Sequence, residues 1–216
     1  MAWGAVIGGL ALLQLLVELL PALKGVVGAI AVATFLYVPL RLLERRGQDA
    51  HDAGWRFDRL RQDLVWSLAV CAIVLPAFGV LFVLFGRWFA YLPPEIRHWI
   101  APYGRVRPFR LEMPLSWGFA GQVAGNAAVA FSEEFFYRGY MTLRFEERWS
   151  PLGSAVAAAA LFAAGHLLTP APWRLAVFFP ALLFAWIRYR TGTIVGASIA
   201  HFLSNVWLLV LEHSMF

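Results

Sequence analysis

Residues 131–140 read FSEEFFYRGY and place two adjacent carboxylates and an arginine inside an apolar run that extends over 115–143. A run of this length is long enough to cross a bilayer as a helix, which takes about 20 residues. Glu134 and Arg138 are four residues apart, so on a helix they share one face and can form an ion pair. Glu133 lies about 100° further round the helix and can point elsewhere. The spacing therefore predicts a paired Glu134 and a Glu133 that remains available as a general base; the alternative is a salt bridge that only braces the bundle.

The composition of the whole chain favours an integral membrane protein. Of 216 residues, 61% are hydrophobic and 14% are charged, with a mean hydropathy of +0.66, whereas a typical soluble domain has about 25% charged residues. The net charge of +5 comes from arginines that fit membrane loops better than a nucleic-acid surface, so no nucleic-acid partner is expected. The single cysteine, Cys71, excludes a disulfide within the chain and a cysteine-based metal site. The amino terminus lacks a basic region and a small-residue cleavage pattern, which predicts a retained span.

Apolar stretches alternate with polar segments along the chain, which predicts an all-α, polytopic membrane bundle of about seven transmembrane helices. The stretches run over 3–20, 25–41, 64–85, 115–143, 152–168, 173–189 and 193–212. Residues 41–63 are expected to form a loop or a surface-lying helix. Residues 86–114 mix aromatics with arginines, as segments along the membrane–water interface do. Pro180 is expected to kink the sixth span.

Arginine and lysine counts predict the orientation of the bundle. If the spans alternate, the segment 41–63, Arg144, Arg148, Arg188 and Arg190 share one face, which then holds ten cations. The other face holds seven, from Lys24, the segment 86–114 and Arg174. Because positive charge is retained on the cytoplasmic side, the amino terminus and 41–63 are predicted to be cytoplasmic.

Several polar side chains fall within the predicted spans, where each ionisable group costs several kcal/mol and is a functional hypothesis by default. They are Glu18, Asn126, Glu133, Glu134, Arg138, His166, His201 and Asn205. His201 and Asn205 are four residues apart and share a helix face, which suits the stabilisation of an oxyanion. The alternatives are helix–helix hydrogen bonds for this pair and a bond to a backbone carbonyl for His166.

The depths of these groups in the membrane agree with one another. At about 1.5 Å per residue, Glu133 lies roughly 22 Å from Arg148, and His166 lies roughly 22 Å from Pro151. By the same measure, Asn205 lies roughly 20 Å and His201 roughly 13 Å from Gly192. Three helices are therefore predicted to deliver polar groups to one site.

Three short motifs in this region resemble those of a known family. EEFFYR (133–138), FAAGH (162–166) and HFLSN (201–205) are similar to the EExxxR, FxxxH and HxxxN motifs of the CPBP intramembrane proteases. That family includes the Rce1-type CAAX prenyl endopeptidases and the bacterial Abi proteins. The resemblance covers about 115–212, which implies a catalytic core there, whereas 1–114 are expected to add amino-terminal transmembrane helices and interfacial loops to the same membrane domain.

The resemblance implies a glutamic-type endopeptidase with an intramembrane active-site cavity, which acts on a membrane-anchored or lipid-embedded peptide or protein. Glu133 and His166 would activate a water molecule, and His201 and Asn205 would stabilise the oxyanion. Glu134 and Arg138 would orient the base and brace the helix. No cofactor is expected. The alternative is zinc or another divalent metal on Glu133, His166 and His201, although the chain lacks the HExxH arrangement.

Two other functions stay open at this point. Buried carboxylate–histidine chains also serve transporters and proton relays, although this sequence shows no inverted repeat. A catalytically silent immunity or scaffold protein of the same fold is the third possibility. The Arg-over-Lys, Ala-rich composition favours a multi-pass protein of a bacterial inner membrane.

Overall fold

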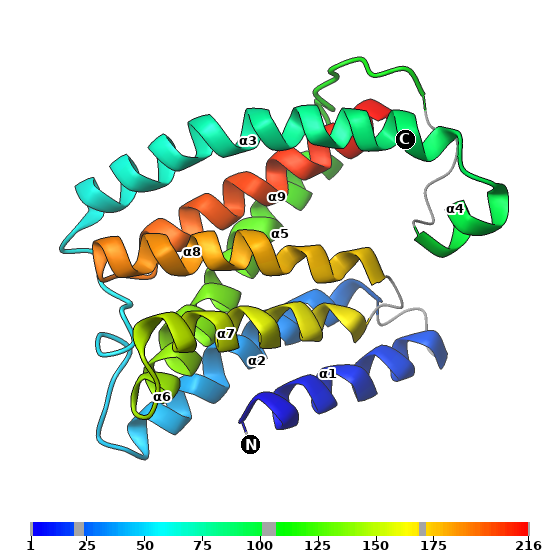
Figure 1. Cartoon of the computed structure of the whole chain (residues 1–216). Helices are drawn as coiled ribbons and strands as arrows, with labels where there is room; N and C mark the ends of the chain where they lie inside the picture. The colour runs from blue at the N-terminus through cyan, green and yellow to red at the C-terminus, as the bar shows by residue number, and fades with distance from the viewer. Residues whose placement is uncertain (1, 20–23, 101–106, 169–171, 216) are drawn as a thin grey trace.

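A computed structural model describes residues 2–19, 24–100, 107–168 and 172–215, and the regular structure within these ranges is helical throughout. The prediction of an all-α fold is therefore confirmed (Figure 1). In chain order the elements are α1 (Ala2–Leu19), α2 (Lys24–Glu44), α3 (Leu60–Ala90), α4 (Pro94–Ile100), α5 (Trp117–Glu134), the π-helix η2 (Phe135–Met141), α6 (Thr142–Glu146), α7 (Pro151–Gly165), the 3-10 helices η3 (His166–Leu168) and η4 (Pro172–Val177), α8 (Phe178–Thr191) and α9 (Val195–Met215).

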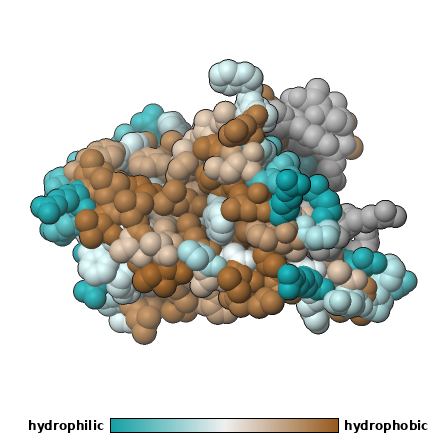
Figure 2. Space-filling view, turned by 90° about the horizontal axis from the view of Figure 1, so that it is seen from above, coloured by the Kyte–Doolittle hydropathy of each residue, from teal (hydrophilic) through white to brown (hydrophobic). Residues whose placement is uncertain are grey.

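Four helical segments are long and apolar enough to cross a membrane: Val26–Glu44, Leu60–Ala90, Pro151–Leu168 and Val195–Met215. Brown apolar side chains cover the middle of the face in Figure 2, and most hydrophilic groups gather toward its ends. Both observations fit a helical membrane bundle. The remaining predicted spans are shorter or less apolar; α8, with 14 residues, covers roughly 21 Å of a hydrocarbon core of about 30 Å. The number of seven spans stays a prediction.

Local sequence sets the ends of the helices around the core. The Ser116 hydroxyl accepts a hydrogen bond from the backbone N–H of Phe119 and caps α5. Ser150 caps α7 in the same way, with a proline at the first helical position. Gly192 ends α8 in the left-handed region, at φ 74°, where a residue without a Cβ is favoured. Ser150 thus separates α6 from α7, and Gly192 separates α8 from α9.

Segments that the sequence assigned to one membrane face do lie at one end of the bundle, on the left in Figure 1. Residues 45–59 form a loop with turns, which settles the choice between a loop and a surface helix over the middle of 41–63. Arg46 binds Glu147 at 3.1 Å, and Arg56 donates to the carbonyl of Gly192 at 3.2 Å. The direction in which this end faces in a cell stays a prediction.

The sixth predicted span differs from the expectation. Instead of one helix kinked at Pro180, the structure has the 3-10 helix η4 followed by α8, which begins at Phe178. Pro180 lies in the first turn of α8, where helical residues have no intrahelical partner for their N–H groups. The proline therefore starts the helix rather than bending it, and the prediction of a kink was wrong.

Two core clusters meet where the polar motifs lie. Phe135, Phe136 and Tyr137 of η2 pack with Phe35 of α2 and Phe162 of α7. Helix α9 packs against α3, α5 and α8, and its Ala197 and Ala200 join Cys71 and Phe184 in the second cluster. Helices from both halves of the chain therefore share one interior, and η2 and α9 bring their polar residues into it.

Candidate active site

The motif at 133–138 spans a change in helix type. Glu133 and Glu134 end α5, and the chain continues directly into η2, which carries Arg138. A π-helical segment is rare and is found mostly at functional sites. Glu134 Oε1 lies 2.9 Å from Arg138 Nη1, and both side chains are fully buried. The ion pair predicted from the four-residue spacing is therefore confirmed.

His201 of α9 lies against both carboxylates. Its Nδ1 is 2.9 Å from Glu134 Oε1, and its Nε2 is 3.7 Å from Glu133 Oε2. The ring also stacks on Phe184 at 4.8 Å between centroids, which holds its plane. Because the arginine-paired carboxylate of Glu134 accepts hydrogen bonds, Nδ1 is the donor and Nε2 faces Glu133.

Exposure separates the two glutamates. The side chain of Glu134 is completely buried, whereas that of Glu133 keeps 16% of its surface exposed. The side chain of Glu133 is therefore partly accessible, whereas that of Glu134 is not. This difference matches the division between a paired and a free carboxylate that the sequence predicts, while the catalytic role of Glu133 itself stays a prediction.

His166 borders the same cluster through an aromatic ring. It lies at the carboxyl end of α7, where its Nδ1 is 2.9 Å from the carbonyl oxygen of Phe162. A carbonyl can only accept, so Nδ1 carries the proton and a neutral ring keeps a lone pair on Nε2. The Phe162 ring contacts both His166, at 4.6 Å, and His201, at 5.8 Å. This bond to a backbone carbonyl is the alternative that the sequence left open for His166. It also leaves Nε2 free to accept a hydrogen bond.

The remaining polar candidates are less closely joined to the cluster. Asn205 lies one turn beyond His201 on α9 and is partly exposed, and no hydrogen bond connects it to Glu133 or Glu134 among the described residues. Asn126 donates to the carbonyl of Gln122 within its own helix. The side chain of Glu18 lies outside the described part of the chain. Asn205 is therefore linked to the site only by its position on α9, the helix that carries His201.

Asp63 supports α9 and was missed by the sequence reasoning. It is fully buried, and its Oδ1 accepts from the Thr193 hydroxyl at 2.6 Å and from the Gly196 N–H at 3.2 Å. A carboxylate at this position stabilises the amino terminus of α9, which carries His201. In the sequence Asp63 is one charge among many in 41–63, and the only signal is its place next to the apolar start of the third span.

The metal alternative needs Glu133, His166 and His201 to converge on one ion, and the choice between it and a site without metal stays a prediction. Within the described ranges, the ligand atoms of Glu133, His166 and His201 do not all come within 4.8 Å of one another. Zinc ligands at about 2.0–2.2 Å from the ion must lie closer together than that. Asp49, His51 and Asp52 do lie that close together, but all three are exposed and far from this cluster in the chain.

Buried carboxylates and histidines in a helical membrane bundle define a class of proteins that perform chemistry or proton transfer within the membrane. Residues 115–207 match the family described as type II CAAX prenyl endopeptidase Rce1-like. Over these residues the chain is similar to the Rce1-like family, and this similarity indicates a protease, in general terms a CAAX-protease-like intramembrane endopeptidase. Comparisons with curated proteins and with solved structures give no match.

Proposed function

We propose that the protein hydrolyses a peptide bond in a membrane-anchored or lipid-embedded protein or peptide, with Glu133 as the general base. The observation that carries the proposal is the position of Glu133: it is the more exposed carboxylate, and it lies beside a histidine that the buried Glu134–Arg138 pair holds in place. A bacterial cytoplasmic membrane is the proposed location.

In the proposed reaction Glu133 takes a proton from a water molecule as the water oxygen attacks the scissile carbonyl carbon. His166 would hold this water through its free Nε2. The tetrahedral intermediate then breaks its C–N bond, and the proton from Glu133 passes to the departing amine. A site shielded from water strengthens each of these electrostatic interactions.

The oxyanion would be stabilised by the Asn205 amide and by His201. Because Nδ1 of His201 already donates to Glu134, its Nε2 can donate only in the imidazolium form. Because Glu133 has taken the water proton by then, Glu134 is the carboxylate that would accompany such a cation. The proposed oxyanion site therefore consists of the Asn205 amide and His201, with Glu134 on the other side of the histidine ring.

The first prediction concerns the base. Glu133→Gln removes the proton acceptor but keeps the shape of the side chain, so peptide cleavage is expected to fall by about 10²–10⁴-fold. The substrate is found by mass spectrometry of membrane proteins from cells with and without the protein, and cleavage is then measured with purified protein in nanodiscs. Glu95→Gln, an exposed change on α4, is the control and should cleave at the wild-type rate.

The outcomes separate the competing functions. If Glu133→Gln cleaved the substrate at the wild-type rate, Glu133 would not be the general base. An unchanged membrane proteome, together with proton or solute flux through reconstituted wild-type protein, would favour the transporter. An unchanged proteome without flux would favour the silent scaffold.

The second prediction concerns metal. Since the candidate ligands do not converge on one point, treatment with 1,10-phenanthroline followed by dialysis is expected to leave cleavage unchanged. Elemental analysis of the active protein should find much less than one zinc per chain. Loss of activity with the chelator, restored by stoichiometric zinc, would contradict the proposed metal-free mechanism.

A further inference from the structure

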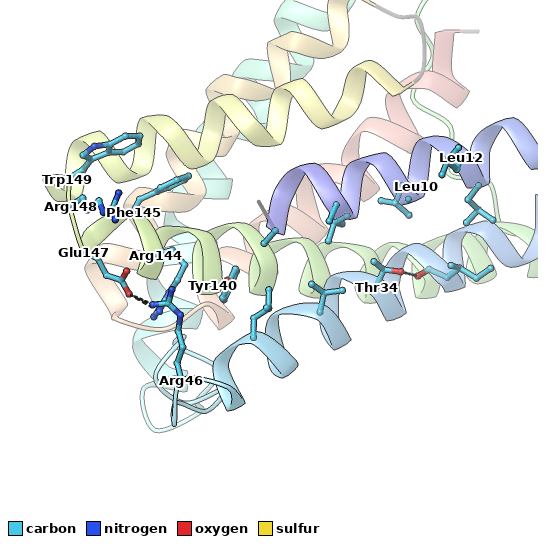
Figure 3. A pocket seen from close by; sticks show the side chains of 18 of the residues that line it. Leu10, Leu12, Thr34, Arg46, Tyr140, Arg144, Phe145, Glu147, Arg148 and Trp149 are labelled. Atoms are coloured by element: carbon cyan, nitrogen blue, oxygen red, sulfur yellow. Dashed lines mark hydrogen bonds and ion pairs between the residues drawn. The ribbon is translucent and has the colours of Figure 1, made fainter.

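A groove with a volume of about 1010 Å³ lies away from the glutamate–histidine cluster, between α1, α2 and the segment from Tyr140 to Trp149 (Figure 3). Most of its walls are aliphatic, including Val6, Leu10, Leu13, Leu16, Ile30 and Val38. Several of these side chains are open to the surroundings of the protein; Leu16 is 48% exposed and Ile30 is 42% exposed. In a membrane, such a groove is filled by hydrocarbon.

One end of the groove is cationic. Arg46, Arg144 and Arg148 line it there together with a single acid, Glu147. Glu147 binds Arg46 at 3.1 Å and Arg144 at 2.7 Å. Arg148 has no acidic partner among the residues that the structure describes, so this end carries an excess of two positive charges.

The charges lie where a lipid headgroup would lie. The cationic end belongs to the same end of the bundle as the 45–59 loop and the turn before α7. Trp149 lines the groove beside the arginines, and tryptophan with arginine marks the membrane–water interface. The groove is therefore apolar at the depth of acyl chains and cationic at the depth of phosphates.

We propose that this groove, the lipid groove, binds an anionic glycerophospholipid. Its acyl chains lie along the aliphatic walls between α1 and α2, and its phosphate binds Arg148 with support from Arg46 and Arg144. A second copy of the chain or a transmembrane segment of a substrate would also cover aliphatic walls. Neither would explain the excess positive charge at one end, whereas an anionic headgroup compensates it.

The test uses the full-length protein, purified in detergent and exchanged with defined lipids. Binding of phosphatidylglycerol and of phosphatidylcholine with the same acyl chains is measured by native mass spectrometry. Wild-type protein is expected to bind phosphatidylglycerol at least about tenfold more tightly. Arg148→Gln is expected to reduce that preference about fivefold, from about 1 kcal/mol per arginine near a membrane surface. Arg61→Gln removes an exposed arginine outside the groove and should leave the preference unchanged.

A second pair of variants tests the aliphatic walls. Gly9 lines the groove, and a Cβ built there meets no atom within 4 Å, so Gly9→Phe should fill the space without a clash. Gly8 is equally open but is not part of the lining. Gly9→Phe is expected to lower the binding of both lipids at least about fivefold, while Gly8→Phe leaves it at the wild-type level.

Thermal unfolding in detergent confirms that each variant is folded before it is compared. Equal affinity for the two lipids in wild-type protein would overturn the proposal. It would also fail if each control variant changed binding as much as its partner, or if the lipid-free protein were a dimer that dissociates on Gly9→Phe.

Discussion

At the scale of single residues, Glu134 is the group on which the polar cluster depends. Its Oε1 accepts from both Arg138 and His201, while its Oε2 is buried and has no hydrogen-bond partner among the residues that the structure describes. Three kinds of contact offset the cost of burying the Arg138 guanidinium. It pairs with Glu134, donates a hydrogen bond to the carbonyl of Ala181 at 3.1 Å, and lies over the rings of Phe162 and Phe184. One carboxylate oxygen thus fixes both the arginine and the catalytic candidate His201.

The third prediction belongs to this scale. Arg138→Met leaves the Glu134 carboxylate buried and unpaired, so the free energy of unfolding should fall by about 3–5 kcal/mol. The measurement is denaturant unfolding in mixed micelles. Arg41→Met, which removes an arginine from an exposed pair with Glu44, is the control and should cause no measurable change. Equal effects of the two substitutions would show that the buried pair does not stabilise the fold.

At the scale of elements, η2 depends on a close approach to the 45–59 loop. A Cβ at Gly139 would lie 2.8 Å from the carbonyl oxygen of Ala53, closer than real contacts allow. The same loop donates from Arg56 to the end of α8, and Ile194, before α9, donates its N–H to the carbonyl of Gly54. The loop therefore fixes η2 relative to the start of α9, which determines how Glu133 and His201 meet.

The fourth prediction tests this contact. Gly139→Ala should lower the free energy of unfolding by about 1–3 kcal/mol, because the loop must move away from η2. Gly125→Ala, in α5, meets no atom within 4 Å and should leave stability unchanged or raise it by up to about 1 kcal/mol. Thermal and denaturant unfolding of the two variants provides the comparison. A destabilised Gly125→Ala with an unaffected Gly139→Ala would contradict the packing described for η2.

At the scale of the whole molecule, charge gathers at the end of the bundle that holds the 45–59 loop. The sequence assigns ten arginines to this end, all those in 41–63, 144–148 and 188–190. It assigns seven cations to the other end. The cationic end of the lipid groove lies on the same side as this loop. The orientation in the membrane therefore decides which leaflet supplies the proposed lipid.

The fifth prediction concerns that orientation. The single cysteine is buried in α3, so Cys71→Ala gives a background without a native thiol. In that background, His51→Cys in the exposed loop should be protected from a membrane-impermeant maleimide in intact cells, because the loop is predicted to be cytoplasmic. Glu95→Cys, exposed on α4, should react. The reverse labelling pattern would show that the protein has the opposite orientation in the membrane.

Much of the fold and part of the site could be predicted from the sequence because they depend on neighbours along the chain. Apolar runs of the right length predict helices, and the four-residue spacing predicts the pairing of Glu134 with Arg138. The same local information failed at Pro180, where the choice between continuing a helix and starting one depends on what precedes it. It also gave no sign of the π-helical turn after Glu134.

By itself, then, the sequence determined the helices, the buried ion pair and the three motifs, which lie within the residues that match the Rce1-like family. Only the tertiary structure decided that His201, 67 residues after Glu134, bonds to that same carboxylate, and that Asp63 holds the start of α9. The physical reason is that a helix fixes which residues share a face. Which face meets which neighbour depends on the packing of side chains such as Phe162 and Phe184 between helices.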